Sequence, residues 1–254
     1  MAARAGHGFW PYWVPFFAFL LLVRVGAALP EPLQPAGLVL RVAVPGALLL
    51  WFARRGAYPE LRGFRATAAG VGLDVAVGLA GAAAWVAPFL LFESLRPEAE
   101  GFDPGLFGPG REPLALGVRA LGYVLVTPFV EELFMRSWLI RYAEVALGRR
   151  WREFRDVPIA HYSRRSFAAV TVFFLLSHAP WEYGVMLVWA LGTTLWLYYR
   201  RHLVPLVIAH AVTNAAILAF AVWGEGRFRD GRGAPIPLWF LVELGGLAPA
   251  WTVP

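Results

Sequence analysis

Long apolar runs separated by short polar segments rich in glycine, proline and arginine make up nearly the whole chain. A helix that spans a bilayer needs about 20 predominantly apolar residues. The pattern therefore predicts an all-α, polytopic membrane helix bundle with about eight transmembrane helices, and residues 1–254 form a single integral membrane domain. The predicted spans are 12–29, 36–53, 66–92, 114–141, 167–181, 183–200, 203–223 and 236–252.

Composition supports the membrane interpretation and removes several kinds of chemistry. Of the 254 residues, 59% are hydrophobic and 16% are charged, whereas about 25% of the residues in soluble domains are charged. The chain has no cysteine, which excludes thiolate zinc sites, iron–sulfur clusters and a cysteine nucleophile. It also lacks lysine, which excludes Ser–Lys catalysis and Schiff-base chemistry.

Charged residues alternate between the predicted loops. The loops after the second, fourth and sixth spans are basic, whereas those after the first and third are acidic. Because positively charged loops stay in the cytoplasm, this alternation places both termini there and predicts an inner-membrane protein. The same rule accounts for the net charge of +6. The bilayer, and not a nucleic acid, is therefore the predicted partner of the arginines.

Several polar residues fall inside predicted spans. Each ionisable group there costs about 2.5–3.5 kcal/mol on insertion scales, so each needs a reason to be present. The three main clusters lie in the fourth, fifth and seventh spans, and their polar members are Glu131, Glu132 and Arg136, then His178, then His210 and Asn214.

Spacing assigns different roles to the two glutamates. Glu132 and Arg136 are four residues apart, share a helical face and can form an ion pair. Glu131 is rotated by about 100° from that face. Burial without a cationic partner disfavours the charged form of a carboxylate, so the carboxylate accepts a proton more readily near neutral pH. A general base needs this property. We therefore predict Glu131 as the proton acceptor and Glu132 with Arg136 as a structural brace.

The two histidines can complete a hydrolytic site. His210 and Asn214 share a helical face and offer two aligned donors for a developing oxyanion. His178, four residues after Phe174, is a candidate for holding a water molecule opposite Glu131. At 1.5 Å per residue, Glu131, His178 and His210 lie about 15, 20 and 12 Å from the predicted cytoplasmic ends of their spans. These similar depths predict one shared cavity nearer the cytoplasmic side.

Other interpretations of these residues stay open. The ion pair can be purely structural, and the histidines and Asn214 can join helices by hydrogen bonds. Two glutamates and two histidines also suit zinc or iron, but H-E-x-x-H and similar spacings are missing, so no metal or other cofactor is predicted. Intramembrane carboxylates can relay protons in transporters, although no internal repeat is present. For Asp74 and Glu243, pairing between helices is predicted.

The ordered set Glu131-Glu132-x-x-x-Arg136, Phe174-x-x-x-His178 and His210-x-x-x-Asn214 resembles the three motifs of the CPBP (ABI) family. This group contains CAAX-prenyl-protease-like (Rce1-type) and bacteriocin-processing membrane proteins. The resemblance covers about residues 114–220, and the spans within 12–92 match only in being hydrophobic. Their aromatic content fits the subgroup associated with exosortase systems.

The resemblance implies a metal-independent, glutamate-type endopeptidase that cleaves a membrane-associated peptide or protein. By motif position, Glu131 and His178 would activate water, while His210 and Asn214 would stabilise the oxyanion. Glu132 and Arg136 would shape the site. The family also contains members without proteolytic activity, so a membrane scaffold or immunity factor stays as an alternative. A metal-dependent membrane protease and a proton-coupled transporter are further alternatives, and the sequence predicts no oligomeric state.

Overall fold

A computed structural model describes residues 8–98, 101–148 and 150–242, and it confirms the all-α prediction, with no strand among these residues. The α-helices are α1 (Trp10–Ala27), α2 (Gln34–Arg54), α3 (Ala68–Leu91), α4 (Glu112–Ala120), α5 (Thr127–Glu132), α6 (Ile140–Leu147), α7 (Arg164–Leu176), α8 (Tyr183–Arg200) and α9 (Leu203–Gly224). The π-helical segments η5 (Leu121–Val126) and η6 (Leu133–Leu139) join α4, α5 and α6 into one continuous helix.

Among the described residues, five helices are long and apolar enough to cross a bilayer: α1, α2 with its preceding turn, α3, the continuous helix Glu112–Leu147, and α9. Their length and apolar composition indicate an integral membrane protein. α7 has only 13 residues and falls short of the required length. In the predicted span 236–252, the described residues 236–242 form no α-helix and contain only a 3₁₀ turn at Trp239–Val242. The rest of this span lies outside the described residues.

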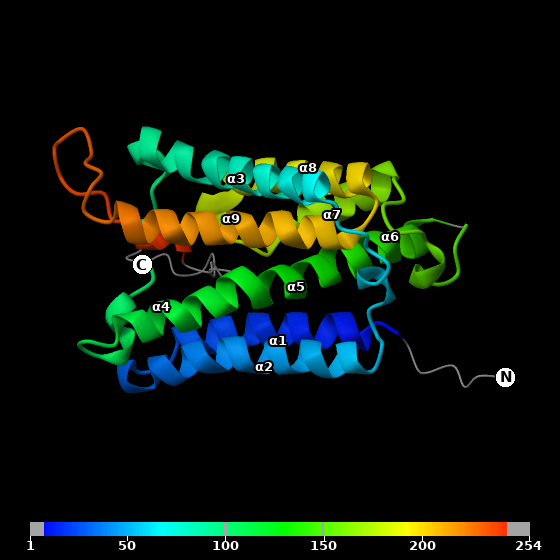
Figure 1. The fold of residues 1–254 in the computed structure, drawn as a ribbon, viewed down its shortest axis with the longest axis horizontal. Coiled ribbons are helices and arrows are strands. Elements are labelled where there is room, and N and C mark those ends of the chain that lie inside the picture. The colour runs from blue at the N-terminus through cyan, green and yellow to red at the C-terminus, as the bar shows by residue number, and fades with distance from the viewer. Residues whose placement is uncertain (1–7, 99–100, 149, 243–254) are drawn as a thin grey trace.

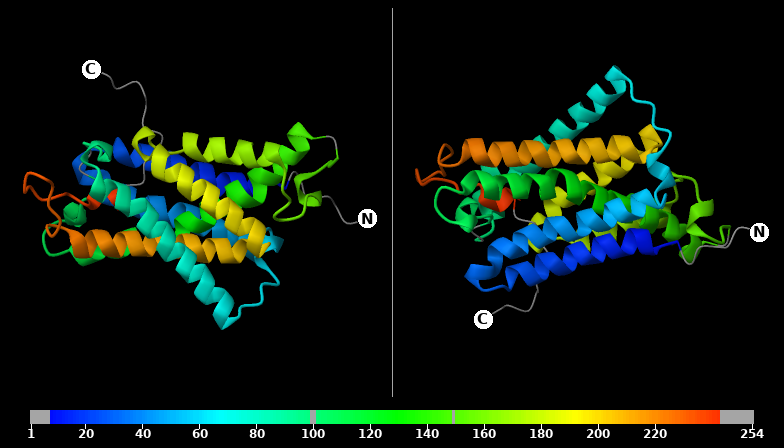
Figure 2. Two further views of the ribbon diagram at one scale, coloured as in Figure 1. Left: turned by 90° about the horizontal axis from the view of Figure 1, so that it is seen from above. Right: turned by 60° about the horizontal axis from the view of Figure 1, so that its bottom comes forward.

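Most of the helices run along the long axis of Figure 1, whereas Figure 2 shows α3 crossing that axis obliquely. The basic loops that follow α2, α6 and α8 gather at one end, on the right of Figure 1, and the loops that follow α1 and α3 lie at the other. Helix α9 has the most buried apolar window, with 56% of it inside the bundle against 28% for α1 and α2. It is therefore the central helix, and α1 and α2 form an outer pair that Figure 2 shows along one side.

A buried carboxylate fastens α3 to α8, as predicted for Asp74. Its Oδ2 lies 3.1 Å from Nη2 of Arg200, and its Oδ1 accepts a hydrogen bond from Nε1 of Trp196 at 3.2 Å. The side chain of Asp74 has no exposed surface, so both contacts replace lost hydration. The corresponding prediction for Glu243 falls outside the described residues.

Helix α3 also packs closely on α9, and one glycine permits this contact. A Cβ atom at Gly78 would lie 2.5 Å from the carbonyl oxygen of Ala209 and 2.7 Å from Cβ of Val212. Neither atom belongs to a flexible side chain, so relief requires the helices to separate. Small residues at such crossings let helix backbones approach one another.

The Gly78→Ala variant is therefore expected to be less stable than the wild type by about 1–3 kcal/mol, the usual cost of overpacking. The measurement is the midpoint of thermal unfolding in detergent micelles. Gly72→Ala is the matched control on the same helix, because nothing lies within 4 Å of its added Cβ. Equal midpoints for the two variants would contradict the close contact between α3 and α9.

Candidate active site

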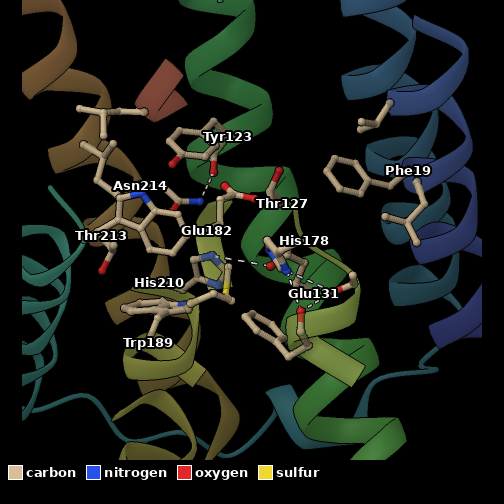
Figure 3. A pocket seen from close by; sticks show the side chains of 18 of the residues that line it. Phe19, Tyr123, Thr127, Glu131, His178, Glu182, Trp189, His210, Thr213 and Asn214 are labelled. Atoms are coloured by element: carbon tan, nitrogen blue, oxygen red, sulfur yellow. Dashed lines mark hydrogen bonds and ion pairs between the residues drawn. The ribbon is translucent and has the colours of Figure 1, made fainter. Parts of the chain in front are cut away.

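The three sequence clusters meet at one cavity in the middle of the bundle (Figure 3). The space open to the centres of water molecules is about 60 Å³, and one water molecule needs about 10–15 Å³ of such space. The cavity therefore has room for a few water molecules. Of the six predicted site residues, four line it: Glu131, His178, His210 and Asn214. Glu132 and Arg136 lie behind this wall, fully buried.

His210 connects the two glutamates. Its Nδ1 lies 2.7 Å from Oε1 of Glu132 and its Nε2 lies 3.9 Å from Oε2 of Glu131. A carboxylate only accepts hydrogen bonds, so Nδ1 carries a hydrogen and donates it to Glu132. The Nε2 atom is thereby turned toward the cavity and Glu131. Glu132 thus orients a histidine in addition to bracing the helix, a role that spacing along one helix did not predict.

The predicted pair between Glu132 and Arg136 is present, with Oε2 and Nη1 3.5 Å apart. Nη2 of Arg136 also donates to Oγ1 of Thr193 on α8 at 2.9 Å. Its guanidinium carbon lies 4.0 Å from the centre of the Phe174 ring, a cation–π contact that compensates part of the charge's lost hydration. Arg136 therefore ties the continuous helix to α7 and α8.

His178 does not lie within a helix, contrary to the predicted span 167–181. Helix α7 ends at Leu176, and His178 occupies the turn that follows. Pro180 accounts for the difference, because proline disfavours helical geometry at the residue before it. Nδ1 of His178 lies 2.7 Å from the carbonyl oxygen of Phe174. Since a carbonyl only accepts, Nδ1 is the donor, and Nε2 of the neutral ring is left as an acceptor.

Asn214 is held by the continuous helix. Its Nδ2 donates to the carbonyl oxygen of Tyr123 at 2.7 Å, and Tyr123 lies in the π-helical segment η5. Such segments occur frequently at functional sites, where they alter the helix's own hydrogen bonding. A carboxamide nitrogen has two hydrogens. The hydrogen bond to Tyr123 uses one of them and fixes the side chain at the cavity wall.

Several residues that line the cavity were not predicted from the sequence, above all Glu182, Trp189, Tyr123 and Thr127. Glu182 is 3% exposed and begins α8 as its N-cap residue. Its position between two predicted spans suggested an ordinary loop residue. The signal that could have identified it was its spacing, since it is an acidic residue four positions after His178. Trp189 packs edge-on against His210, with ring centres 5.3 Å apart. Aromatic residues in an apolar helix carry no comparable signal.

Metal binding receives no support from the arrangement of donors. Among the described residues, no group of three or more histidine or acidic side chains is placed to hold a metal ion. The donor set around the cavity is instead paired internally, through contacts of His210 with both glutamates and of His178 with a backbone carbonyl.

Residues 113–216 match the family described as type II CAAX prenyl endopeptidase Rce1-like. Over this segment the chain is similar to CAAX-protease-related proteins. The matched segment begins at the start of the continuous helix and ends two residues after Asn214, so it contains all six predicted site residues. No curated protein and no solved structure matches the chain.

Helices α1, α2 and α3 lie outside the segment that is similar to this family. They nevertheless contribute to the cavity wall, through Phe16, Phe19, Leu20 and Val23 of α1 and through Trp85 of α3. One wall of the cavity therefore comes from helices outside the matched segment, and its side chains are aromatic or aliphatic.

Proposed function

We propose that this protein is a glutamate-type intramembrane endopeptidase, which hydrolyses a peptide bond of a membrane-associated substrate without a metal ion. The observation that carries the proposal is that Glu131, His178, His210 and Asn214, from three separate parts of the chain, line one cavity with room for a few water molecules. Two acceptors and two potential oxyanion donors in one enclosed space are the requirements for attack by water on a carbonyl carbon.

Glu131 and His178 hold the attacking water. The carboxylate of Glu131 accepts one of its hydrogens, and Nε2 of His178 accepts the other, because Nδ1 is occupied at Phe174. With both hydrogens fixed, an oxygen lone pair faces the scissile carbonyl. As the O–C bond forms, Glu131 takes a proton from the water, which is general-base catalysis.

His210 and Asn214 stabilise the negative oxygen of the tetrahedral intermediate. Asn214 supplies the amide hydrogen that the Tyr123 carbonyl leaves available. A neutral His210 that donates from Nδ1 to Glu132 has no hydrogen on Nε2, so only the doubly protonated ring can donate to the oxyanion. Glu132 is the counter-ion for that form. When the C–N bond breaks, Glu131 returns its proton to the leaving nitrogen. The products are a carboxylic acid, which keeps the second hydrogen of the water, and an amine, and in water they ionise to a carboxylate and an ammonium group.

Location and substrate follow as further parts of the proposal. The basic loops lie at one end of the bundle, which supports an inner-membrane orientation with that end in the cytoplasm. The substrate class is a peptide held at the membrane, and the exosortase association remains a hypothesis about its pathway. Neither a prenyl group on the substrate nor an oligomeric state is required by this mechanism.

The direct test uses purified protein in proteoliposomes with a pool of fluorogenic peptides, each present with and without a farnesylated cysteine. Mass spectrometry identifies the cleaved bonds. We expect cleavage of at least one peptide and an unchanged rate after prolonged treatment with EDTA and 1,10-phenanthroline. Loss of activity that added Zn²⁺ restores would instead support a metal-dependent protease.

A comparison in cells tests the alternative that the protein is a scaffold or immunity factor without catalytic activity. Deletion of the gene is expected to remove specific new amino termini from the membrane proteome, and only an active enzyme should restore them. A scaffold or immunity factor predicts that the Glu131→Gln, His178→Ala and His210→Ala variants all rescue the deletion phenotype. That result would contradict the proposed function.

A further inference from the structure

A buried glutamate outside the three motifs lines the same cavity. Glu182 is 3% exposed and lies on the cavity wall, where Figure 3 shows it among the polar side chains. Burying a carboxylate is costly unless its oxygens are hydrogen-bonded, so its partners in the protein matter. Its position in the chain, four residues after His178, indicates what its role is.

Glu182 closes the turn that carries His178. Its Oε2 accepts a hydrogen bond from the backbone N–H of Ala179 at 3.0 Å, and its own backbone N–H donates to the Ala179 carbonyl at 2.9 Å. Ala179, which directly follows His178, is 3% exposed. These reciprocal bonds satisfy both backbone polar groups of Ala179, and so hold the peptide units on either side of it, as in a capping box.

The other end of the turn is held by α7. The backbone N–H of His178 donates to the Leu175 carbonyl at 3.0 Å, and its ring donates to Phe174 at 2.7 Å. These bonds fix the start of the turn, whereas Glu182 fixes its end. Because His178 lies in a turn rather than a helix, its direction depends on both anchors.

We propose that Glu182 is a positioning residue, which holds the 177–179 turn so that Nε2 of His178 faces the cavity opposite Glu131. The inference rests on the proposed function for its catalytic consequence. What the turn requires from Glu182 is a side-chain acceptor of the right length for the Ala179 N–H. A glutamine supplies that acceptor, whereas an alanine does not.

The experiment compares Glu182→Ala and Glu182→Gln with wild-type protein in proteoliposomes, using the peptides that wild-type protein cleaves. Glu182→Ala is expected to lower kcat at least tenfold with little change in KM, and Glu182→Gln to restore at least half of wild-type turnover. Glu112→Ala is the matched control. It removes a carboxylate that also accepts from a backbone N–H, that of Gly110 at 3.1 Å, but at an exposed site. Its turnover should equal that of wild type.

A double-mutant cycle separates positioning from a general structural effect. If Glu182 acts through His178, the Glu182→Ala/His178→Ala protein should be no slower than His178→Ala alone, because residues that act as a unit are non-additive. A kcat of the double variant that is lowered by the product of the two single fold-decreases would overturn the proposal. So would a Glu182→Gln variant as slow as Glu182→Ala.

A second measurement is independent of proteolysis. Diethyl pyrocarbonate modifies neutral histidine, and mass spectrometry measures the rate at each position. Modification of His178 should become several-fold faster in Glu182→Ala and return to the wild-type rate in Glu182→Gln, with His161 as internal reference. An unchanged rate at His178 in Glu182→Ala would overturn the positioning role. If wild-type protein cleaves no peptide, the proposed function fails, while this labelling result still decides the role of Glu182.

Discussion

The Glu131→Gln variant is expected to fold normally and to lose peptide hydrolysis by about 10²- to 10⁴-fold in kcat, the contribution usual for a general base. Glutamine preserves the size of the side chain and can still accept a hydrogen bond from water. It cannot take the proton as the O–C bond forms. Binding of substrate does not depend on that proton, so KM should change little.

Glu93→Gln is the control for this substitution, since it makes the same chemical change at an exposed carboxylate in the turn Glu93–Leu95. Its kcat should equal that of wild type. Both variants should unfold at the wild-type temperature, which excludes misfolding as the cause of lost activity. Wild-type turnover by Glu131→Gln on the same peptide would remove Glu131 from the reaction.

The second large effect is expected at Glu132, where stability and activity are affected together. Glu132→Leu leaves the guanidinium of Arg136, whose side chain is 1% exposed, without its carboxylate. Breaking a buried ion pair in this way costs about 3–5 kcal/mol, because one charge remains buried without compensation. The substitution also removes the acceptor at Nδ1 of His210. We therefore expect a strongly lowered unfolding midpoint and no detectable turnover.

Two further variants separate these consequences. Asp74→Leu also removes a fully buried carboxylate, but its partner Arg200 has 21% of its side chain exposed and can regain hydration. Its loss of stability should be clearly smaller. Glu132→Gln keeps an acceptor for His210 but no longer balances a protonated ring, so it should remain folded while kcat falls. A Glu132→Leu protein as stable as Asp74→Leu would show that the buried pair does not stabilise the bundle.

Much of the fold follows from composition and periodicity. Apolar runs locate α1, α2, α3, the continuous helix and α9 to within several residues, because each must present an apolar surface to lipid. Periodicity was less successful for α7, which ends at Leu176 instead of continuing to 181. The end of this helix depends on Pro180 and on local hydrogen bonds, which hydrophobicity alone does not register.

The residues of the candidate site also fall into two groups, those that the sequence indicated and those that it did not. A polar or ionisable residue in an apolar run is conspicuous, which is why the sequence singled out the six candidates Glu131, Glu132, Arg136, His178, His210 and Asn214. Their expected roles in catalysis remain predictions. Glu182 was not found, because it falls in a short break between two apolar runs, where a charged residue is ordinary.

By itself, the sequence determined that this is a helical membrane protein and which buried polar residues are candidates for its chemistry, since both follow from the cost of placing charge in hydrocarbon. Only the tertiary structure decided how those residues are paired. The contact of Glu132 with His210 joins positions 78 residues apart, and the turn that carries His178 is closed by Glu182. Helix packing and backbone geometry set such partnerships, and spacing along one helix records only neighbours on that helix.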